Sequence, residues 1–195
     1  MVTTDVIKKL RDETGVSVMQ CKKALEEAGG DVAKAVVILK KKGADAAAKK
    51  ADRTLNAGTI AAYIHATGTV GAMVEIACET DFVAKNPEFK QLAYDIAMHV
   101  AASKPEFLKK EDITKEAREL AASVFEKEVS GKTKDMKEKI LEGKLAAYFS
   151  ERVLLEQPFI KNPEVNISGL VDSAVQKFGE KMEIIRFVRF GVLEK

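Results

Sequence analysis

The sequence changes its periodicity within one stretch, Val74-Glu75-Ile76-Ala77-Cys78-Glu79-Thr80-Asp81-Phe82-Val83-Ala84-Lys85-Asn86. The residues alternate as far as Cys78, which is the pattern of a strand with one buried face. From Phe82 the pattern favours a short helix, and Pro87 ends it because proline cannot continue a helix. We therefore expect an acid, Asp81, and an aromatic, Phe82, at a strand-to-helix corner, where functional residues often lie.

The segment before this stretch carries the signals of three short helices, over residues 1–43. Each predicted helix begins at a residue whose side-chain oxygen can accept a hydrogen bond from an unpaired backbone N–H: Thr3 or Thr4, Ser17 and Asp31. Each ends at glycine, which permits a left-handed turn: Gly15, Gly29-Gly30 and Gly43. Residues 44–55 are rich in alanine and lysine, and we interpret them as a helical linker.

The remaining residues, 56–195, mix strands and helices. Alternation on both sides of Ala66-Thr67-Gly68-Thr69 predicts a hairpin over 58–78 in which each strand buries one face. Helical periodicity follows over 88–103, 114–129 and, with a break at Gly143, 134–149. An apolar, β-leaning run covers 153–160, a helix capped by Asn166 or Ser168 extends to Phe178, and a long strand covers 182–190. The sequence therefore predicts an α+β fold with a small, mainly antiparallel sheet.

The composition is that of an ordinary soluble globular protein. Of the 195 residues, 46% are hydrophobic and 32% are charged, and 32 basic residues nearly balance 30 acidic ones. Lysine and glutamate are interspersed along most helical stretches, which favours solvated surfaces over direct binding of nucleic acid. No apolar run approaches the roughly 18–20 residues that a membrane span requires. The first ten residues are too charged for a signal peptide, so we expect a cytoplasmic protein.

Residues suited to chemistry are few and scattered. Two cysteines, Cys21 and Cys78, and two histidines, His65 and His99, are too widely spaced for a recognisable zinc site. No phosphate-binding loop, dinucleotide-binding glycine motif or nucleophile elbow is present. We therefore predict no catalytic residue, no metal and no cofactor, and we expect reduced thiols and structural or surface histidines.

The corner itself has two local readings. Asp81 can be a first-turn carboxylate favoured by the helix dipole, with Phe82 an ordinary core aromatic. Alternatively, Phe82 projects outward, where a lone aromatic on a rigid corner suits insertion into a pocket of a partner.

Four ordered motifs resemble the elongation factor Ts family. The first is Leu10-Arg11…Thr14-Gly15…Cys21-Lys22-Lys23-Ala24-Leu25-Glu26…Gly30-Asp31, and the second is the corner, Cys78 to Asn86. The third is Glu142-Gly143-Lys144-Leu145…Tyr148-Phe149…Leu155-Glu156-Gln157-Pro158-Phe159, and the fourth is Gly179-Glu180…Arg186-Phe187…Arg189-Phe190.

This resemblance implies a function. The family exchanges guanine nucleotide on elongation factor Tu, without covalent chemistry. The corner residues Thr80, Asp81, Phe82 and Val83 would form the wedge that displaces Mg²⁺ from that GTPase. A ubiquitin-associated-like module, residues 1–43, would add a second contact through Leu10, Val18 and Met19, although Leu10 can equally belong to the core of the module.

The resemblance also implies a homodimer, since short members of the family with one core half pair with themselves. No cysteine occurs from Phe187 to Lys195, so the dimer would be noncovalent, through the strand at 182–190. Three alternatives stay open: a ubiquitin-associated-type module for another partner, a ribosome- or RNA-associated protein, and an enzyme that uses His65 or His99. If Phe82 acts as a wedge, its side chain must be exposed in the free protein.

Overall fold

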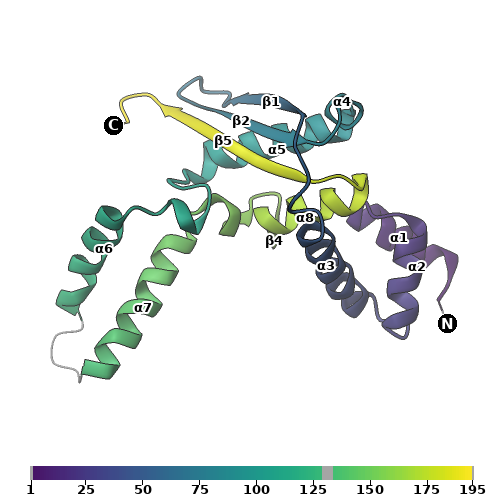
Figure 1. Ribbon diagram of the computed structural model, residues 1–195, viewed down its shortest axis with the longest axis horizontal. Coiled ribbons are helices and arrows are strands. Elements are labelled where there is room, and N and C mark those ends of the chain that lie inside the picture. Colours follow the sequence, from purple (N-terminus) through teal and green to yellow (C-terminus); the bar gives the residue numbers. More distant parts are fainter. Residues whose placement is uncertain (1, 129–133, 195) are drawn as a thin grey trace.

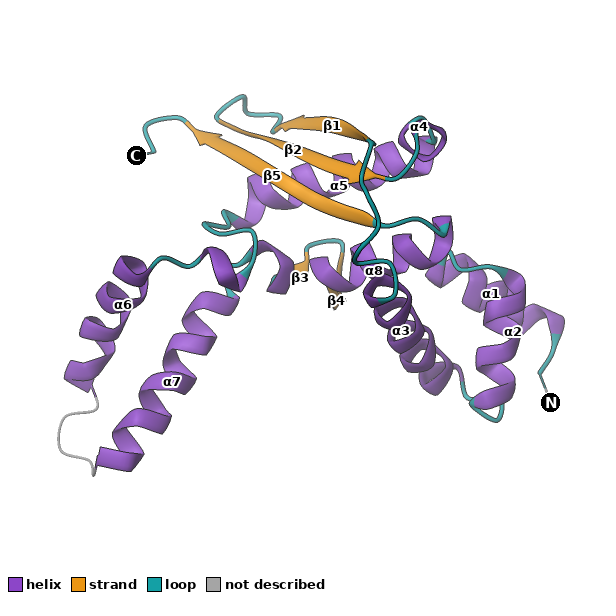
Figure 2. Cartoon of the chain, viewed as in Figure 1, coloured by secondary structure: helices purple, strands orange, loops and turns teal. Residues whose placement is uncertain are grey.

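The computed structural model describes residues 2–128 and 134–194, and its elements are arranged as in Figure 1 and Figure 2. The first three elements are the helices α1 (Thr4–Thr14), α2 (Val18–Glu27) and α3 (Val32–Ala48). Thr3, Ser17 and Asp31 cap them, each accepting a hydrogen bond from a backbone N–H of the first turn. The helices share one buried cluster: Leu10, Val16, Cys21, Ala24, Leu25, Ala35 and Leu39.

The third helix does not end at Gly43, so the predicted stop there is wrong. Helix α3 continues to Ala48, and the predicted linker contains its last turn followed by turns and irregular chain. Gly43 is buried where α3 contacts α8 (Ile167–Phe178), and a Cβ on it would lie 3.4 Å from the carbonyl oxygen of Asp172. Glycine is therefore present because it lets the two helices approach closely, at a helix-propensity cost of about 1 kcal/mol.

An antiparallel sheet of three strands lies above these helices in Figure 1. Its order is β1 (Ala57–Ile64), β2 (Val70–Cys78) and β5 (Met182–Gly191), which confirms the predicted hairpin and the predicted last strand. Helix α5 (Pro87–Ser103) packs along one face. The main core forms between this helix, the sheet and α8, and its largest fully buried side chains include Val74, Ile76, Phe89 and Ile96.

No described element covers the opposite face of the sheet, which is partly apolar. In β1 the half-buried side chains are those of Thr59, Ala61 and Tyr63, whereas Ile60 and Ile64 are exposed on the other face. Met73 of β2 and Val188 and Phe190 of β5 are exposed on the same face. In the strand register, Met73 pairs with Ala62 on one side and Val188 on the other, and Phe190 pairs with Gly71. Because both faces of these strands carry apolar residues, alternation alone could not say which face would be covered.

A pair of helices, α6 (Lys115–Glu128) and α7 (Lys134–Ser150), projects from the body side by side (Figure 2). They have their own small cluster around Ala121, Leu145 and Phe149. Helix α7 passes through Gly143, so the predicted break is wrong. Within the described residues, nothing apart from its chain neighbours and the backbone of its own helix lies within 4 Å of a Cβ built at Gly143, and this glycine is exposed in the helix. The predicted end of the preceding helix, near 129–131, lies outside the described residues.

Short elements connect this arm to α8. Two 3₁₀ turns, Lys110–Asp112 and Leu154–Glu156, flank the arm, and β3 (Pro158–Phe159) pairs with β4 (Asn162–Asn166). The β-leaning run at 153–160 thus contributes a strand of only two residues, Pro158 and Phe159. The fold is α+β, as predicted. None of the described helices is both long and apolar enough to cross a membrane.

Candidate functional site

The corner after β2 contains two helix starts within a few residues. The strand ends at Cys78, and Thr80 caps the one-turn helix α4 (Asp81–Ala84), its Oγ1 accepting from the Val83 N–H at 3.4 Å. Asn86 then caps α5, its Oδ1 accepting from the Glu88 N–H at 2.8 Å. These caps fix where each helix begins, and α4 consequently stands at one end of the sheet (Figure 1).

Phe82 projects from this corner into solvent. Its residue is 80% exposed, although phenylalanine is one of the side chains most often buried. The prediction that Phe82 is exposed is confirmed, and the alternative of a core aromatic is wrong. An exposed aromatic on a capped turn has the form of a side chain that enters a partner's pocket.

Val83, the next residue, has the opposite environment. It is 3% exposed and belongs to the main core. Neighbouring residues of a helix point about 100° apart, so one can be buried while the other is exposed. The expectation that Val83 takes part in the wedge surface needs correction, because its side chain holds α4 on the core and is covered by it.

Asp81 lies on the exposed side of the corner. Its Oδ2 accepts a hydrogen bond from Lys85 Nζ at 2.6 Å, one helical turn later. That hydrogen bond, and then the charge of Lys85, hold the pKa of Asp81 below its usual range. Asp81 is therefore ionised at neutral pH, and the ion pair contributes little stability because both side chains are solvated.

The turn before α4 is tied to the segment that precedes β5. Glu180 accepts two hydrogen bonds from Thr80, one from its N–H at 3.0 Å and one from its hydroxyl at 2.6 Å. Glu79 in turn accepts from the Lys181 backbone N–H and, at 3.2 Å, from Arg53 Nη1. We call these residues the clasp: Arg53, Glu79, Thr80, Glu180 and Lys181. Sequence reasoning missed it because its halves lie about a hundred positions apart, as the separation of Thr80 and Glu180 shows.

The expected N-terminal contact residues separate into two kinds. Val18 and Met19 open α2 and are 54% and 64% exposed, so both are accessible to a partner. Leu10 is 0% exposed and lies in the core of the three helices. Its proposed contact is therefore wrong, because a partner could reach Leu10 only after the module opened.

The histidines and cysteines have structural environments. His99 is fully buried, with Nδ1 accepting from the Ile160 N–H at 3.3 Å and Nε2 lying 2.9 Å from Gln157 Oε1. Burial lowers the pKa of His99, so it stays neutral near pH 7. Cys21 and Cys78 are both buried, and burial raises the pKa of each thiol. Within the described ranges, no cluster of three His, Cys, Asp or Glu side chains could hold a metal ion.

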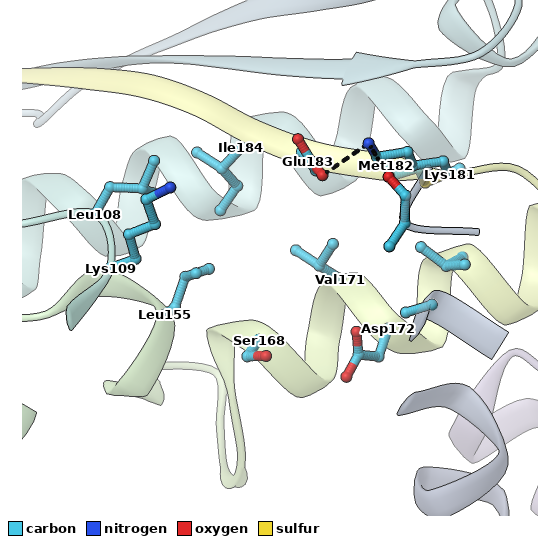
Figure 3. Close-up of a pocket in the computed structure, with 13 residues that line it drawn as sticks. Leu108, Lys109, Leu155, Ser168, Val171, Asp172, Lys181, Met182, Glu183 and Ile184 are labelled. Atoms are coloured by element: carbon cyan, nitrogen blue, oxygen red, sulfur yellow. Dashed lines mark hydrogen bonds and ion pairs between the residues drawn. The ribbon is translucent and has the colours of Figure 1, made fainter. Parts of the chain in front are cut away.

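A cavity of about 330 Å³ opens between α8 and the start of β5 (Figure 3). Its lining is partly apolar and includes Asp172, whose pKa is raised by burial. Lys181 and Glu183 form an ion pair at its edge, with Nζ and Oε1 3.1 Å apart. Among the described residues, no histidine or cysteine lines this cavity.

Comparison with known proteins gives one consistent result. A sequence profile described as Elongation factor TS matches residues 23–194. A protein of Carboxydothermus hydrogenoformans named Elongation factor Ts is 49% identical over 196 residues, covering 100% of this chain and 90% of that protein. Proteins with the same name from Thermodesulfovibrio yellowstonii and Thermotoga petrophila are 49% and 45% identical, covering 98% and 99% of this chain and 96% and 97% of their own lengths.

Proposed function

The chain belongs to the elongation factor Ts family, and on this basis we propose that it is a guanine nucleotide exchange factor for elongation factor Tu. It would act in the cytoplasm during translation elongation, binding the GDP-bound GTPase and promoting GDP release so that GTP can bind. The observation that carries the proposal is the exposed Phe82 on its capped corner.

Exchange of this kind needs no covalent step. A tightly bound guanine nucleotide owes much of its affinity to Mg²⁺ and to a cradle of backbone N–H groups around its phosphates. A factor that binds the nucleotide-free GTPase more tightly than the loaded one must, by linkage, weaken nucleotide binding by the same ratio. The chain therefore requires no catalytic acid or base, no metal and no cofactor of its own, and it is not an enzyme in the covalent sense.

The corner residues would share this work. Phe82 would enter a seam between helices beside the nucleotide site, which would shift the ligands of Mg²⁺ and the phosphate loop. Asp81 and Thr80 would lie at the edge of the same contact, with Asp81 bringing a negative charge. Val83 would contribute from below, by anchoring α4 to the core. Val18 and Met19 would form the second contact, on the three-helix module.

The test is release of labelled GDP from elongation factor Tu with and without this chain. A buried hot-spot aromatic is worth about 2–4 kcal/mol. Since each 1.4 kcal/mol is about tenfold, Phe82→Ala should slow stimulated release by roughly one to three decades. The matched control is Leu120→Ala, which truncates an aliphatic side chain that is 71% exposed on α6.

Two outcomes would count against the proposal. If Phe82→Ala combined with Asp81→Ala left stimulated GDP release unchanged, the corner would not be the wedge. If the chain did not stimulate release at all but bound RNA with a steep salt dependence, the ribosome- or RNA-associated alternative would replace it.

We also propose that the chain forms a noncovalent homodimer through the uncovered face of its sheet. Exposed apolar side chains from β1 and β5 lie on that face, including Ile64 and Phe190, which flank Gly71 across the strands. Both cysteines are buried, so neither is available for a bridge. Light scattering at micromolar concentration should give the mass of a dimer, and Phe190→Lys should reduce it toward the monomer. A monomer mass for the unmodified chain would exclude the dimer.

A further inference from the structure

We propose that Glu180 is a positioning residue that holds the turn bearing Phe82 in the orientation required for exchange. The inference rests on the proposed function, because it assigns a role in that activity to a residue that does not itself lie in the wedge. It comes from the clasp, in which Glu180 and Glu79 contact each other's neighbours across the end of the sheet.

The contact between Glu180 and Thr80 determines the direction of a hydroxyl. Thr80 lies beyond Cys78–Met182, the last ladder pair of β2 and β5, so the sheet does not bind its N–H. Glu180 accepts that N–H at 3.0 Å and the Thr80 hydroxyl at 2.6 Å. A carboxylate only accepts, so the hydroxyl hydrogen must point toward Glu180, which leaves an Oγ1 lone pair for the Val83 N–H. Glu180 thereby sets the helix cap.

The contacts of Glu79 run in the reverse direction and reinforce the first pair. Its carboxylate accepts from the Lys181 N–H and from Arg53, and the side chain is only 21% exposed. The hydrogen bond from Lys181 is the main reason that the pKa of Glu79 lies below its usual range. Lys181 Nζ also donates to the Ala51 carbonyl at 2.6 Å. The turn before α4 is thus bound both to the start of β5 and to the chain leading from α3.

This support matters because the corner has little of its own. Helix α4 spans four residues, too few to be stable in isolation. Phe82 is 80% exposed and so has little packing to hold it in the free protein. Its direction therefore depends on the Thr80 cap and on the anchoring of Val83. If only a fraction of molecules presented the turn correctly, the wedge would act in that fraction alone.

Glu180→Gln is the sharpest variant. The amide that replaces the carboxylate has one acceptor oxygen and one donor group, whereas Thr80 presents two donors, so one contact is lost or reversed. We expect the rate of GDP release at saturating factor to fall about tenfold, in line with loss of a charge-assisted hydrogen bond. The factor concentration giving half the maximal rate should change little, because Val18 and Met19 still dock.

A control variant and a second variant of the Thr80–Glu180 contact complete the experiment. Glu183→Gln is the matched control, since Glu183 is a carboxylate on β5 that pairs with Lys181 Nζ, whereas the carboxylate that accepts from Thr80 is that of Glu180. Thr80→Val removes the hydroxyl that donates to Glu180 and should behave like Glu180→Gln. If Glu180→Gln lowered the unfolding midpoint substantially, Thr80→Val would carry the test in its place.

Amide hydrogen exchange of the free chain gives a readout independent of nucleotide release. Glu180→Gln should speed amide hydrogen exchange over residues 80–84, while amide hydrogen exchange in α5 and the unfolding midpoint stay unchanged. If Phe82→Ala slows GDP release but Glu180→Gln and Thr80→Val change neither release nor amide exchange, the positioning role is refuted and the proposed function stands. If Phe82→Ala has no effect, the wedge is refuted, and faster exchange at 80–84 would still support Glu180 as the residue that orders the turn.

Discussion

Leu10→Ala should loosen the three-helix module while leaving its exposed surface unchanged. The Leu10 side chain is completely buried among the side chains shared by α1, α2 and α3. Leucine-to-alanine changes at such sites cost about 2–5 kcal/mol, because the lost burial is compounded by a cavity that closes only in part. A helical unit this small has little stability to lose. We therefore expect α1 and α2 to open, while α3 stays attached to α8.

The measurement is amide hydrogen exchange resolved by segment. A loss of about 3 kcal/mol corresponds to roughly a hundredfold rise in the open fraction, since 1.4 kcal/mol is a factor of ten. Exchange in α1 and α2 should accelerate by that factor, with exchange in α5 and the sheet unchanged. Met19→Ala is the control: the side chain is 64% exposed, and its removal should alter stability by less than about 0.5 kcal/mol.

The two variants also separate packing from contact. Met19→Ala should weaken binding to elongation factor Tu without altering protection, whereas Leu10→Ala should weaken both together. Unchanged protection in α1 and α2 of the Leu10→Ala protein would refute the reasoning. If the Leu10→Ala protein kept its protection in α1 and α2 but lost binding to elongation factor Tu, Leu10 would be a direct contact.

Three further predictions follow from buried groups and helix packing. Burial raises the pKa of Asp172 above that of the unfolded chain, so the folded state binds more protons above about pH 3.9 and loses stability as pH rises; Asp172→Asn should raise the unfolding midpoint at pH 7 but not at pH 3. Burial lowers the pKa of His99, so below about pH 6.5 the unfolded chain binds the extra proton and the folded state loses stability as pH decreases. Denaturant titrations should therefore show a smaller loss of stability from pH 7 to pH 5 in His99→Gln than in the unmodified chain. Gly43→Leu should cost about 1–3 kcal/mol by forcing α3 from α8, whereas Gly143→Ala should stabilise by up to about 1 kcal/mol, and thermal unfolding of the pair checks both signs.

Sequence reasoning succeeded where the deciding contact is local. Thr3, Ser17 and Asp31 cap helices by accepting a backbone N–H three residues later, so the signal and its partner lie within one window of sequence. The hairpin and its corner were predictable for the same reason. Exposure of Phe82 could be predicted only from the wedge role that the resemblance implies, because phenylalanine is more often buried.

Reasoning from sequence failed where distant residues decide. Gly43 and Gly143 look alike as helix stops, yet the first is required by the approach of α8 and the second lies in open solvent within a helix. Membership of a motif likewise does not show which side of a helix a residue occupies, so Leu10 and Val83 were assigned to surfaces that they do not reach. Only the folded chain could reveal the contact of Glu180 with Thr80.

With the two contacts proposed above, the unbroken course of α3 would make the chain a bivalent ligand with a fixed span. The helix leaves the three-helix module, passes Gly43 and packs on α8, and its Lys40 Nζ donates to the Glu164 carbonyl of β4 at 2.8 Å. Once one of the two proposed contacts had formed, the other would meet the partner at an effective concentration set by rigid geometry, with little chain entropy to lose. Two modest contacts can then give a long-lived complex, but only with a partner whose two sites match that span. Under the proposed function, partner choice would consequently depend on the length of a helix as much as on the side chains that make the two contacts.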